Sequence, residues 1–276
     1  MTAAVSDLSD DASAAMAELA ELLAPAPPAN VCGLPAGIHL GVPEDVYHRR
    51  ELGVASKSAL DQLHRSPAHY YAWVTGEAED EDSPALRFGK AFHTATLEPS
   101  KYVASARTKK DRDDAEAIAG MVASVRRHPV AGPLVECCDP EVTLVWGASG
   151  VRCKGRLDGY NPMGDPTAFD LKSTSDASPE GFAKSVANYG YARQEAMYRD
   201  GLEALGEPLA RFYFVAVEKA PPYAVAVYEL HDAWVEMGRR TIARDLDRLA
   251  ECCAAGTFPS YAQNIVTLEP PKWATT

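Results

Sequence analysis

Two strands joined by a turn are predicted by residues 151–172, which read VRCKGRLDGYNPMGDPTAFDLK. Residues 151–157 alternate roughly between apolar and polar side chains, several turn formers follow, and the last six residues are again typical of a strand. Because side chains two apart in a strand project to the same side, Asp170 and Lys172 face one shared space. The hairpin predicts that the Asp158 carboxylate converges on the same space.

Two carboxylates and an ammonium group around one space indicate a particular chemistry. Carboxylate oxygens suit Mg²⁺ or Mn²⁺, which keep several waters and leave coordination positions for phosphate oxygens. A lysine in that space steadies the charge that develops on phosphorus or helps to deprotonate the attacking water. Phosphodiester hydrolysis is therefore our hypothesis. The alternative is that Asp158 caps the hairpin turn while Asp170 and Lys172 form an edge-strand ion pair.

A wider set of motifs surrounds this hairpin. In chain order they are Gly89-Lys-Ala-Phe-His93 with Leu97-Glu-Pro99, Gly155-Arg-Leu-Asp158-Gly, Asp170-Leu-Lys172-Ser-Thr and Gln194-Glu-Ala-Met-Tyr198. This ordered set resembles that of RecB-type nucleases of the PD-(D/E)xK superfamily, and it is most similar to the nuclease domain of exonuclease VIII (RecE) and its phage-encoded relatives. The resemblance covers about residues 41–274.

The resemblance assigns roles to the central residues. It implies that His93, Asp158 and Asp170 are metal ligands, that the backbone carbonyl of Leu171 completes the metal shell, and that Lys172 is the catalytic lysine together with the two aspartates. Mg²⁺ is the implied cofactor, and Mn²⁺ is expected to substitute for it. The ordinary alternative for His93, which lies in a mostly apolar helical run, is a packed core histidine.

Residues of the last motif are expected to bind substrate. Gln194 and Tyr198 lie four apart in a predicted helix, so they share one face and can orient the lysine or a DNA phosphate. Tyr189 and Tyr191 immediately precede the motif and are candidates for contact with a DNA end, of which we take Tyr191 as the substrate-binding residue. For Gln194 and Tyr198, an ordinary half-exposed pair is the alternative.

The net charge of −12 argues against a nucleic-acid partner until its distribution is considered. Residues 1–48 hold seven acids and no Lys or Arg, and residues 77–82 hold five more acids, so these segments account for the whole excess. Arg152, Lys154 and Arg156 alternate on the strand that leads to Asp158 and share one face. That face either tracks a phosphate backbone, with Arg156 as a substrate-binding residue, or is a solvated outer face of the sheet.

The expected fold is α/β, with a central mixed β-sheet flanked by helices in a restriction-endonuclease-like core and additional N-terminal helices. One of these helices is predicted to run from Ser56 or Ser58 to about Thr75. We expect an acidic, Pro-rich and mobile arm over residues 1–37 and a single nuclease domain over residues 38–276. The six cysteines lack iron–sulfur or zinc spacing, so no iron–sulfur cluster is expected.

The function that the resemblance implies is that of an Mg²⁺-dependent exodeoxyribonuclease. It would act on double-stranded DNA ends with 5′-to-3′ polarity and produce single-stranded tails for recombination, with a RecT-type single-strand annealing protein as partner and a homo-oligomer as the active form. No apolar run long enough to span a membrane occurs, so no membrane association and a cytoplasmic location are expected, in a bacterial host cell if a phage or prophage encodes the chain. Alternatives are an endonuclease or repair nuclease of the same superfamily, and a non-catalytic module that binds DNA ends.

Overall fold

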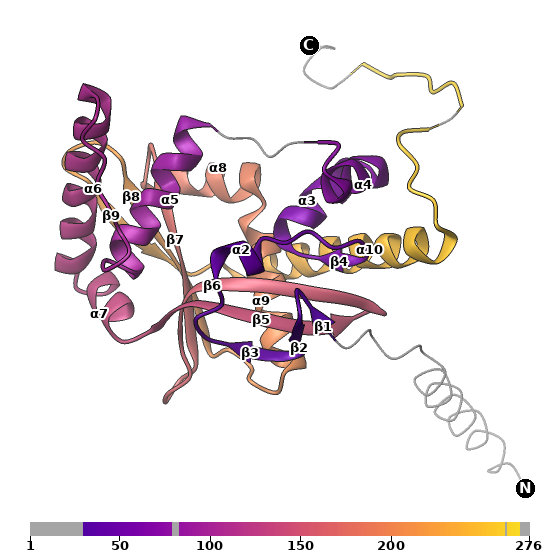
Figure 1. Cartoon of the computed structure of the whole chain (residues 1–276), viewed down its shortest axis with the longest axis horizontal. Helices are drawn as coiled ribbons and strands as arrows, with labels where there is room; N and C mark the ends of the chain where they lie inside the picture. Colours follow the sequence, from indigo (N-terminus) through magenta and orange to yellow (C-terminus); the bar gives the residue numbers. More distant parts are fainter. Residues whose placement is uncertain (1–29, 79–82, 263, 271–276) are drawn as a thin grey trace, which may run out of the picture.

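Seven strands of the described residues form one mixed sheet that carries helices on both faces (Figure 1). The structure is a computed structural model, and it describes residues 30–78, 83–262 and 264–270. The sheet order is β3-β5-β6-β7-β8-β9, β4 pairs with β6, and β1 and β2 form a separate ribbon. The strands are β1 (Asn30–Val31), β2 (Leu34–Pro35), β3 (Gly37–His39), β4 (Val54–Ala55), β5 (Asp139–Ala148), β6 (Val151–Asn161), β7 (Thr167–Thr174), β8 (Arg211–Glu218) and β9 (Val225–Tyr228).

The helices enclose two hydrophobic cores, one on each face of the sheet. One core includes residues of α3, α4, α8, α9 and α10, and the other includes residues of α5, α6 and α7. The helices are α2 (Glu44–Tyr47), α3 (Lys57–Arg65), α4 (Pro67–Thr75), α5 (Pro84–Leu97), α6 (Lys109–Arg127), α7 (Ala131–Glu136), α8 (Pro179–Tyr189), α9 (Tyr191–Ala204) and α10 (Asp232–Ala255). The prediction of a central mixed sheet flanked by helices, with further helices before it, is therefore confirmed.

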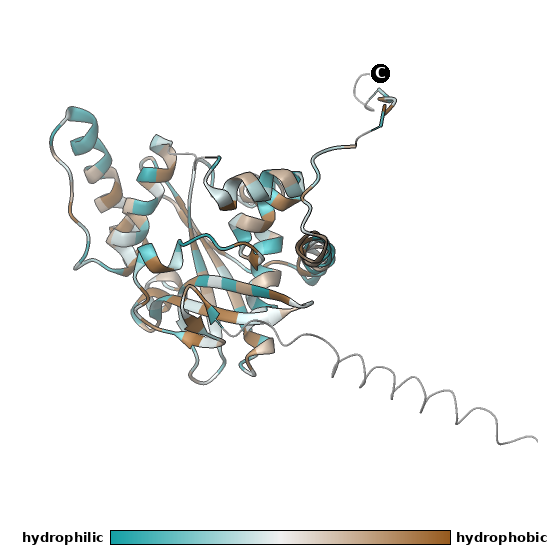
Figure 2. Ribbon diagram, turned by 45° about the vertical axis from the view of Figure 1, so that its right-hand side comes forward, coloured by the Kyte–Doolittle hydropathy of each residue, from teal (hydrophilic) through white to brown (hydrophobic). Residues whose placement is uncertain are grey.

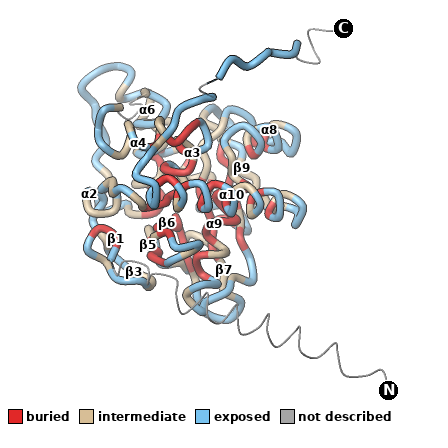
Figure 3. The backbone as a smooth tube through the Cα atoms, turned by 90° about the vertical axis from the view of Figure 1, so that its right-hand side faces the viewer, coloured by how far each residue is buried: buried red, intermediate tan, exposed pale blue. Residues whose placement is uncertain are grey.

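Side chains that alternate along β7 and β8 hold the two layers together. Phe212 and Phe214 belong to the core beneath α9, whereas Phe169 and Leu171 belong to the core beneath α5 and α6. Figure 2 shows hydrophobic residues on the strands and more hydrophilic ones on the outer turns of the helices, and Figure 3 shows the buried segments gathered in β5, β6, β7 and α9. By the same alternation, Asp170 faces the α9 side of the sheet.

β6 is the strand around which the sheet is organised. It pairs with β5 along nearly its whole length, but its other edge is shared, because β4 pairs with it at Arg152 and Cys153 and β7 pairs with it only from Gly159 to Asn161. The β6–β7 ladder therefore ends at the pair of Gly159 and Phe169. Beyond that pair the two strands separate, and side chains from other elements have room to enter.

Two further points concern the ends of the chain and its helices. Residues 1–29, which make up most of the arm predicted for residues 1–37, lie outside the described residues, while residues 30–39 contribute β1, β2 and β3. Among the described residues, no helix has both the length and the apolar character needed to cross a membrane.

The basic residues of β6 hold an N-terminal strap, which we define as residues 30–52. Lys154 is only 7% exposed, and its ammonium donates hydrogen bonds of 2.6 Å to the carbonyls of Tyr47 and Arg49 and lies 3.3 Å from Cys32 Sγ. Arg152 donates to the carbonyl of Asn30 at 2.7 Å. The β6 face was predicted either to track a DNA backbone or to be a solvated outer face of the sheet. Both predictions were wrong for Arg152 and Lys154, because a chain segment distant in sequence covers them and accepts hydrogen bonds from their N–H groups.

The strap contacts predict a loss of stability when Lys154 is replaced by Met. The substitution keeps the aliphatic stem but leaves two carbonyl oxygens without their donor, which we expect to cost about 2 kcal/mol of the free energy of unfolding. Urea denaturation followed by circular dichroism measures the change. Lys184→Met, on the exposed surface of α8, is the matched control and is expected to stay within about 0.5 kcal/mol of wild type.

The same pair of variants separates the strap role from a role in binding DNA. When a lysine that contacts a phosphate is removed, the slope of log DNA affinity against log salt concentration becomes shallower by about one. We expect Lys154→Met to leave that slope unchanged. Wild-type stability together with a reduced slope would contradict the assignment of Lys154 to the strap.

Candidate active site

Three acidic residues lie side by side on three neighbouring strands. In the β6–β7 register Gly159 is opposite Phe169, so the next position places Asp158 opposite Asp170, where the ladder has just ended. In the β5–β6 register Pro140 is opposite Gly159 and Val142 is opposite Leu157, which places Glu141 opposite Asp158. Residues opposite each other on antiparallel strands have neighbouring side chains. The separation of β6 from β7 therefore gathers three carboxylates.

The Asp158 side chain is held by the backbone of β7, just beyond the point where the β6–β7 ladder ends. Its Oδ2 accepts a 2.7 Å hydrogen bond from the Leu171 N–H and lies 3.3 Å from His93 Nδ1. Asp158 is buried and His93, from α5, is half-buried. The structure thus brings together the predicted metal ligands His93, Asp158 and Asp170 with the backbone of Leu171.

Lys172 is held by a group of polar contacts on the α9 side. Its Nζ lies 2.6 Å from Asp170 Oδ2 and donates a 3.0 Å hydrogen bond to Gln194 Oε1. The amide of Gln194 in turn donates to Asp170 Oδ1 and, at 3.3 Å, to the Tyr198 hydroxyl. One glutamine therefore fixes both the carboxylate and the ammonium group. Gln194 and Tyr198 share a helix face, as their spacing of four predicts.

The position of α9 depends on two glycines. Gly190, with φ of 66°, ends α8 and is the residue from which α9 begins, so that Gln194 falls in the first turns of the helix. Farther along α9, the Tyr198 ring lies against Gly155 of β6, where an added Cβ would be 2.8 Å from the ring. Only a glycine at this point of β6 lets α9 approach the sheet this closely.

Aromatic rings line the approach to Lys172. Its ammonium lies 4.4 Å from the centre of the Tyr191 ring, which stacks on Phe214 and on Tyr189. Tyr189 is 61% exposed, whereas Phe214 is fully buried. The aromatic stack therefore runs from the core to the surface beside Lys172, which the resemblance implies is the catalytic lysine.

Burial and mutual repulsion govern the ionisation of the acids. Burial raises the pKa of Asp158 well above its usual range, and the neighbouring Asp170 raises it further. Burial, followed by the charge of Asp158, raises the pKa of Glu141 to about 7. Both shifts arise first from burial of the carboxylates, and a bound cation would favour their ionised forms.

The two basic groups of the cluster are shifted in different directions. Burial lowers the pKa of His93, which favours the neutral imidazole, the form that binds metals. Burial would also lower the pKa of Lys172, but Asp170, Tyr191 and Asp158 together raise that pKa above its usual value. Lys172 is therefore held as an ammonium ion.

The donor atoms fit a divalent cation. Asp170 Oδ2 is buried and its contact among the described residues is the 2.6 Å ion pair with the Lys172 ammonium. One ligand atom each from His93, Glu141 and Asp158 lies within 4.8 Å of the others. Carboxylate oxygens suit Mg²⁺ and Mn²⁺, and a neutral imidazole is a common metal ligand in proteins.

Glu141 is the site residue that sequence reasoning missed. It is half-buried, and it has a φ of 54°, a left-handed conformation that is uncommon for a glutamate. The usable signal was the Ser149-Gly150 turn, because a two-residue hairpin turn fixes the register of the strands it joins. Counting outward from that turn places Glu141 opposite Asp158.

Arg156 lies beside the cluster rather than in open solvent. Its guanidinium donates to the Val42 carbonyl at 2.9 Å and to Thr143 Oγ1 at 3.2 Å, lies 3.6 Å from Glu141 Oε2, and covers the Tyr47 ring at 4.1 Å. These contacts join the strap to Glu141. A role of Arg156 in binding substrate stays a prediction.

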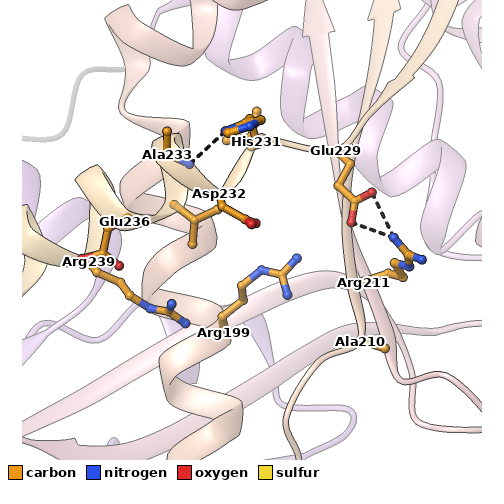
Figure 4. A pocket seen from close by; sticks show the side chains of 11 residues that line it. Arg199, Ala210, Arg211, Glu229, His231, Asp232, Ala233, Glu236 and Arg239 are labelled. Atoms are coloured by element: carbon orange, nitrogen blue, oxygen red, sulfur yellow. Dashed lines mark hydrogen bonds and ion pairs between the residues drawn. The ribbon is translucent and has the colours of Figure 1, made fainter.

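A hollow elsewhere on the molecule has a different character (Figure 4). It encloses about 1060 Å³ and is lined by residues of α9, β8, α10 and the loop before α10. Its arginines have acidic partners, since Arg211 pairs with Glu229, Arg239 with Asp200, and Arg199 with the buried Glu195 outside the lining. None of the predicted site residues lines it, so we do not place the chemistry there.

Comparisons with known proteins place the chain in a family and show solved structures that it resembles. The model of a PDDEXK-like domain of unknown function (DUF3799) matches residues 56–269. The chain resembles a candidate exonuclease from Eubacterium rectale with a TM-score of 0.61 and 16% identity, covering 85% of this chain and 97% of that one. It also resembles a phage-related exonuclease from Haemophilus somnus 129PT with a TM-score of 0.36 and 12% identity, covering 77% of this chain and 98% of that one. No curated protein gives a significant match.

The match of the family model spans most of the chain and includes every strand of the cluster, together with α5 and α9. The resemblance to the PD-(D/E)xK superfamily is confirmed. The chain therefore belongs to the family of PDDEXK-like domains of unknown function.

Proposed function

We propose that this protein is an Mg²⁺-dependent exodeoxyribonuclease that acts on double-stranded DNA ends and leaves single-stranded tails for recombination. The observation that carries the proposal is the locked arrangement of Asp170, Lys172 and Gln194 beside Asp158. An ammonium group and two carboxylates that meet at one point are suited to metal-assisted hydrolysis of a phosphodiester. The membership of the PDDEXK-like family supports the same chemistry.

The residues divide the work between them. His93, Asp158, Asp170 and the Leu171 carbonyl would hold the cation, which supplies positive charge against the phosphate and activates a water. Lys172 places a fixed positive charge where negative charge develops on the phosphate oxygens. Gln194 holds the Lys172 and Asp170 side chains in fixed positions through its hydrogen bonds, so neither has to be reordered when substrate binds.

The aromatic stack supports a role in handling DNA ends. Tyr189 is exposed and lies against Tyr191, which is in contact with the Lys172 ammonium. Bases that leave a duplex stack well on such rings, and each stacking contact contributes about 1–3 kcal/mol. An unpaired nucleotide on Tyr189 would bring its phosphate toward Lys172.

The finer features of the proposal rest on the sequence resemblance. They are 5′-to-3′ polarity, a RecT-type annealing protein as partner, and a homo-oligomer that stays on its DNA. The alternatives are an endonuclease or repair nuclease with the same site, and a module that binds DNA ends without cutting them. Closed circular DNA distinguishes the first alternative, because an enzyme that needs ends leaves it intact.

The substrate requirement is tested with linear duplexes labelled at the 5′ or the 3′ end, incubated with Mg²⁺ beside closed circles. We expect the 5′ label to appear at once in short products, the 3′ label to remain on long single strands, and the circles to survive. Denaturing gels measure both product sizes. Rapid nicking of the circles would favour the endonuclease, and the absence of any product from either substrate would favour the binding module.

The site assignment is tested with Asp170→Asn and Lys172→Ala. Each is expected to lower the cleavage rate by at least about a hundredfold, because Asp170→Asn weakens the hold on the cation and Lys172→Ala removes a positive charge beside the phosphate. Only Asp170→Asn is expected to abolish the rise in melting temperature that Mg²⁺ produces, because Lys172 is not a ligand. Calorimetry and a labelled-DNA assay measure these effects.

Two variants serve as matched controls for this experiment. Asp165→Asn lies in the exposed turn between β6 and β7, and Lys184→Ala lies on the exposed surface of α8. Both should cleave at the wild-type rate. If Asp170→Asn cleaved DNA as fast as Asp165→Asn did, the assignment of Asp170 would be wrong.

A further inference from the structure

Helix α5 carries positive charge toward the acidic cluster. Arg87 and Lys90 precede His93 at spacings of three residues, so the three side chains lie on one broad face of the helix. His93 reaches Asp158 at 3.3 Å, which places the His93 end of this face at the site. The helix contains no Asp or Glu. A protein of net charge −12 therefore presents a positive helix face that leads to the cluster.

Lys90 is held only loosely by the protein. Its ammonium lies 3.8 Å from Glu44 Oε1, its only charged partner among the described residues, and both side chains are 68% exposed. An ion pair of this length at the surface contributes little to stability. Lys172 and Arg156, which also lie beside the cluster, instead donate hydrogen bonds to protein groups. The Lys90 ammonium is therefore available to an external anion.

The contact between Lys90 and Glu44 lies at the rim of the cluster. Glu44 begins α2 of the strap, and Tyr47 ends the same helix with its ring centre 4.1 Å from the Arg156 guanidinium. Both helices border the cluster, α5 through His93 and α2 through Arg156. A phosphate that displaced Glu44 from Lys90 would therefore remain beside the site.

The aromatic stack lies on the other side of the same opening. α9 packs on one face of the sheet and α5 on the other, and Lys172 contacts the Tyr191 ring on the α9 side. A strand whose base stacks on Tyr189 and whose phosphate lies against Lys172 would leave the cluster along α5. The next phosphates of that strand would then meet cations on successive turns of the helix.

We propose that Lys90 and Arg87 form a phosphate track along α5, which holds the strand being cut on the side of the cluster opposite Tyr189. The inference deepens the proposed function and rests on it. Both residues are positioning residues, because they bind phosphates next to the scissile one and take no part in the chemical step. Glu44 holds Lys90 before DNA binds and is then displaced, since the carboxylate and the phosphate compete for one ammonium group.

The phosphate track is tested by measuring the affinity for a 3′-tailed duplex at several salt concentrations, by fluorescence anisotropy, with Ca²⁺ in place of Mg²⁺. Denaturing gels check that the DNA stays intact. We expect Lys90→Met to lower the affinity at least about threefold and to make the slope of log affinity against log salt shallower by about one. The variant that combines Lys90→Met with Arg87→Met should lose about two from the slope. A wild-type slope in Lys90→Met would overturn the inference.

Glu44→Gln gives a readout of opposite sign. It is expected to raise the affinity for the same duplex, because it removes an acid that competes with DNA for Lys90. A structural role of the ion pair predicts no such gain. An affinity equal to or below that of wild type would show that Lys90 does not exchange Glu44 for a phosphate, which would overturn the inference.

Cleavage kinetics with Mg²⁺ separate positioning from chemistry. Lys90→Met is expected to raise KM at least about threefold at unchanged kcat, because the contact is equally strong in the ground state and in the transition state. A loss of kcat at unchanged KM would overturn the assignment of Lys90 as a positioning residue.

Lys110→Met is the matched control. The Lys110 side chain on α6 is 65% exposed and pairs with one acid, Asp114, as Lys90 pairs with Glu44. We expect this variant to keep the wild-type slope and KM. A loss of slope equal to that of Lys90→Met would overturn the inference, because affinity would then follow total charge rather than position. Thermal melting checks that all variants are folded, as expected for substitutions at exposed positions.

Failure of this inference is distinguishable from failure of the proposed function. A protein that cuts DNA ends, with wild-type KM and salt slope in Lys90→Met, keeps the proposed function and loses the phosphate track. A protein whose DNA affinity depends on Lys90 but which cuts no DNA keeps the phosphate track and loses the nuclease. Both results are obtained with the full chain.

Discussion

The separation of β6 from β7 is the constraint on which the site depends. A strand that leaves its partner exposes backbone N–H groups, and a buried N–H without an acceptor costs free energy comparable to a lost hydrogen bond. At the first position beyond the ladder the Asp158 side chain accepts the N–H of Leu171 and replaces the missing strand. One hydrogen bond therefore gives the buried Leu171 N–H an acceptor and also holds Asp158 beside Asp170. The same opening admits His93 from α5 and Gln194 from α9.

Charge balance ties this opening to elements on either side of it. Three carboxylates, two of them buried, would repel one another strongly in a medium of low dielectric constant. Lys172 offsets the charge from the α9 side, where Gln194 and Tyr191 hold it, and Arg156 offsets it from the strap side. The packing of α9 on Gly155 and the attachment of the strap to β6 are for this reason part of the electrostatics of the site.

Periodic patterns made the centre of the site predictable. The period of two put Asp170 and Lys172 in one space, and the period of about four did the same for Gln194 and Tyr198. Patterns of this kind were of no use for strands of two residues such as β1, β2 and β4, which show no period at all. The helix expected from Ser56 or Ser58 to Thr75 is interrupted at Ser66, because the following proline disfavours helical geometry in the residue before it.

Contacts between residues distant in sequence account for the remaining differences between the sequence-based predictions and the structure. Arg152, Lys154 and Arg156 alternate as an exposed face would, and nothing near them in sequence shows that residues 30–52 lie across them. Glu141 was equally hidden, since its role follows from the register of a partner strand rather than from its neighbours. The roles of individual site residues in catalysis are predictions that the geometry supports.

The strap also bears on where the physical domain starts. The family match begins at residue 56, yet the carbonyls that receive Lys154 and Arg156 belong to residues 42–49. A recombinant fragment cut at the recognisable family boundary would retain all the matched sequence and expose a buried ammonium group on β6. The minimal folding unit thus extends upstream of the family signature, and truncations or fusions intended to preserve it should begin no later than Asn30.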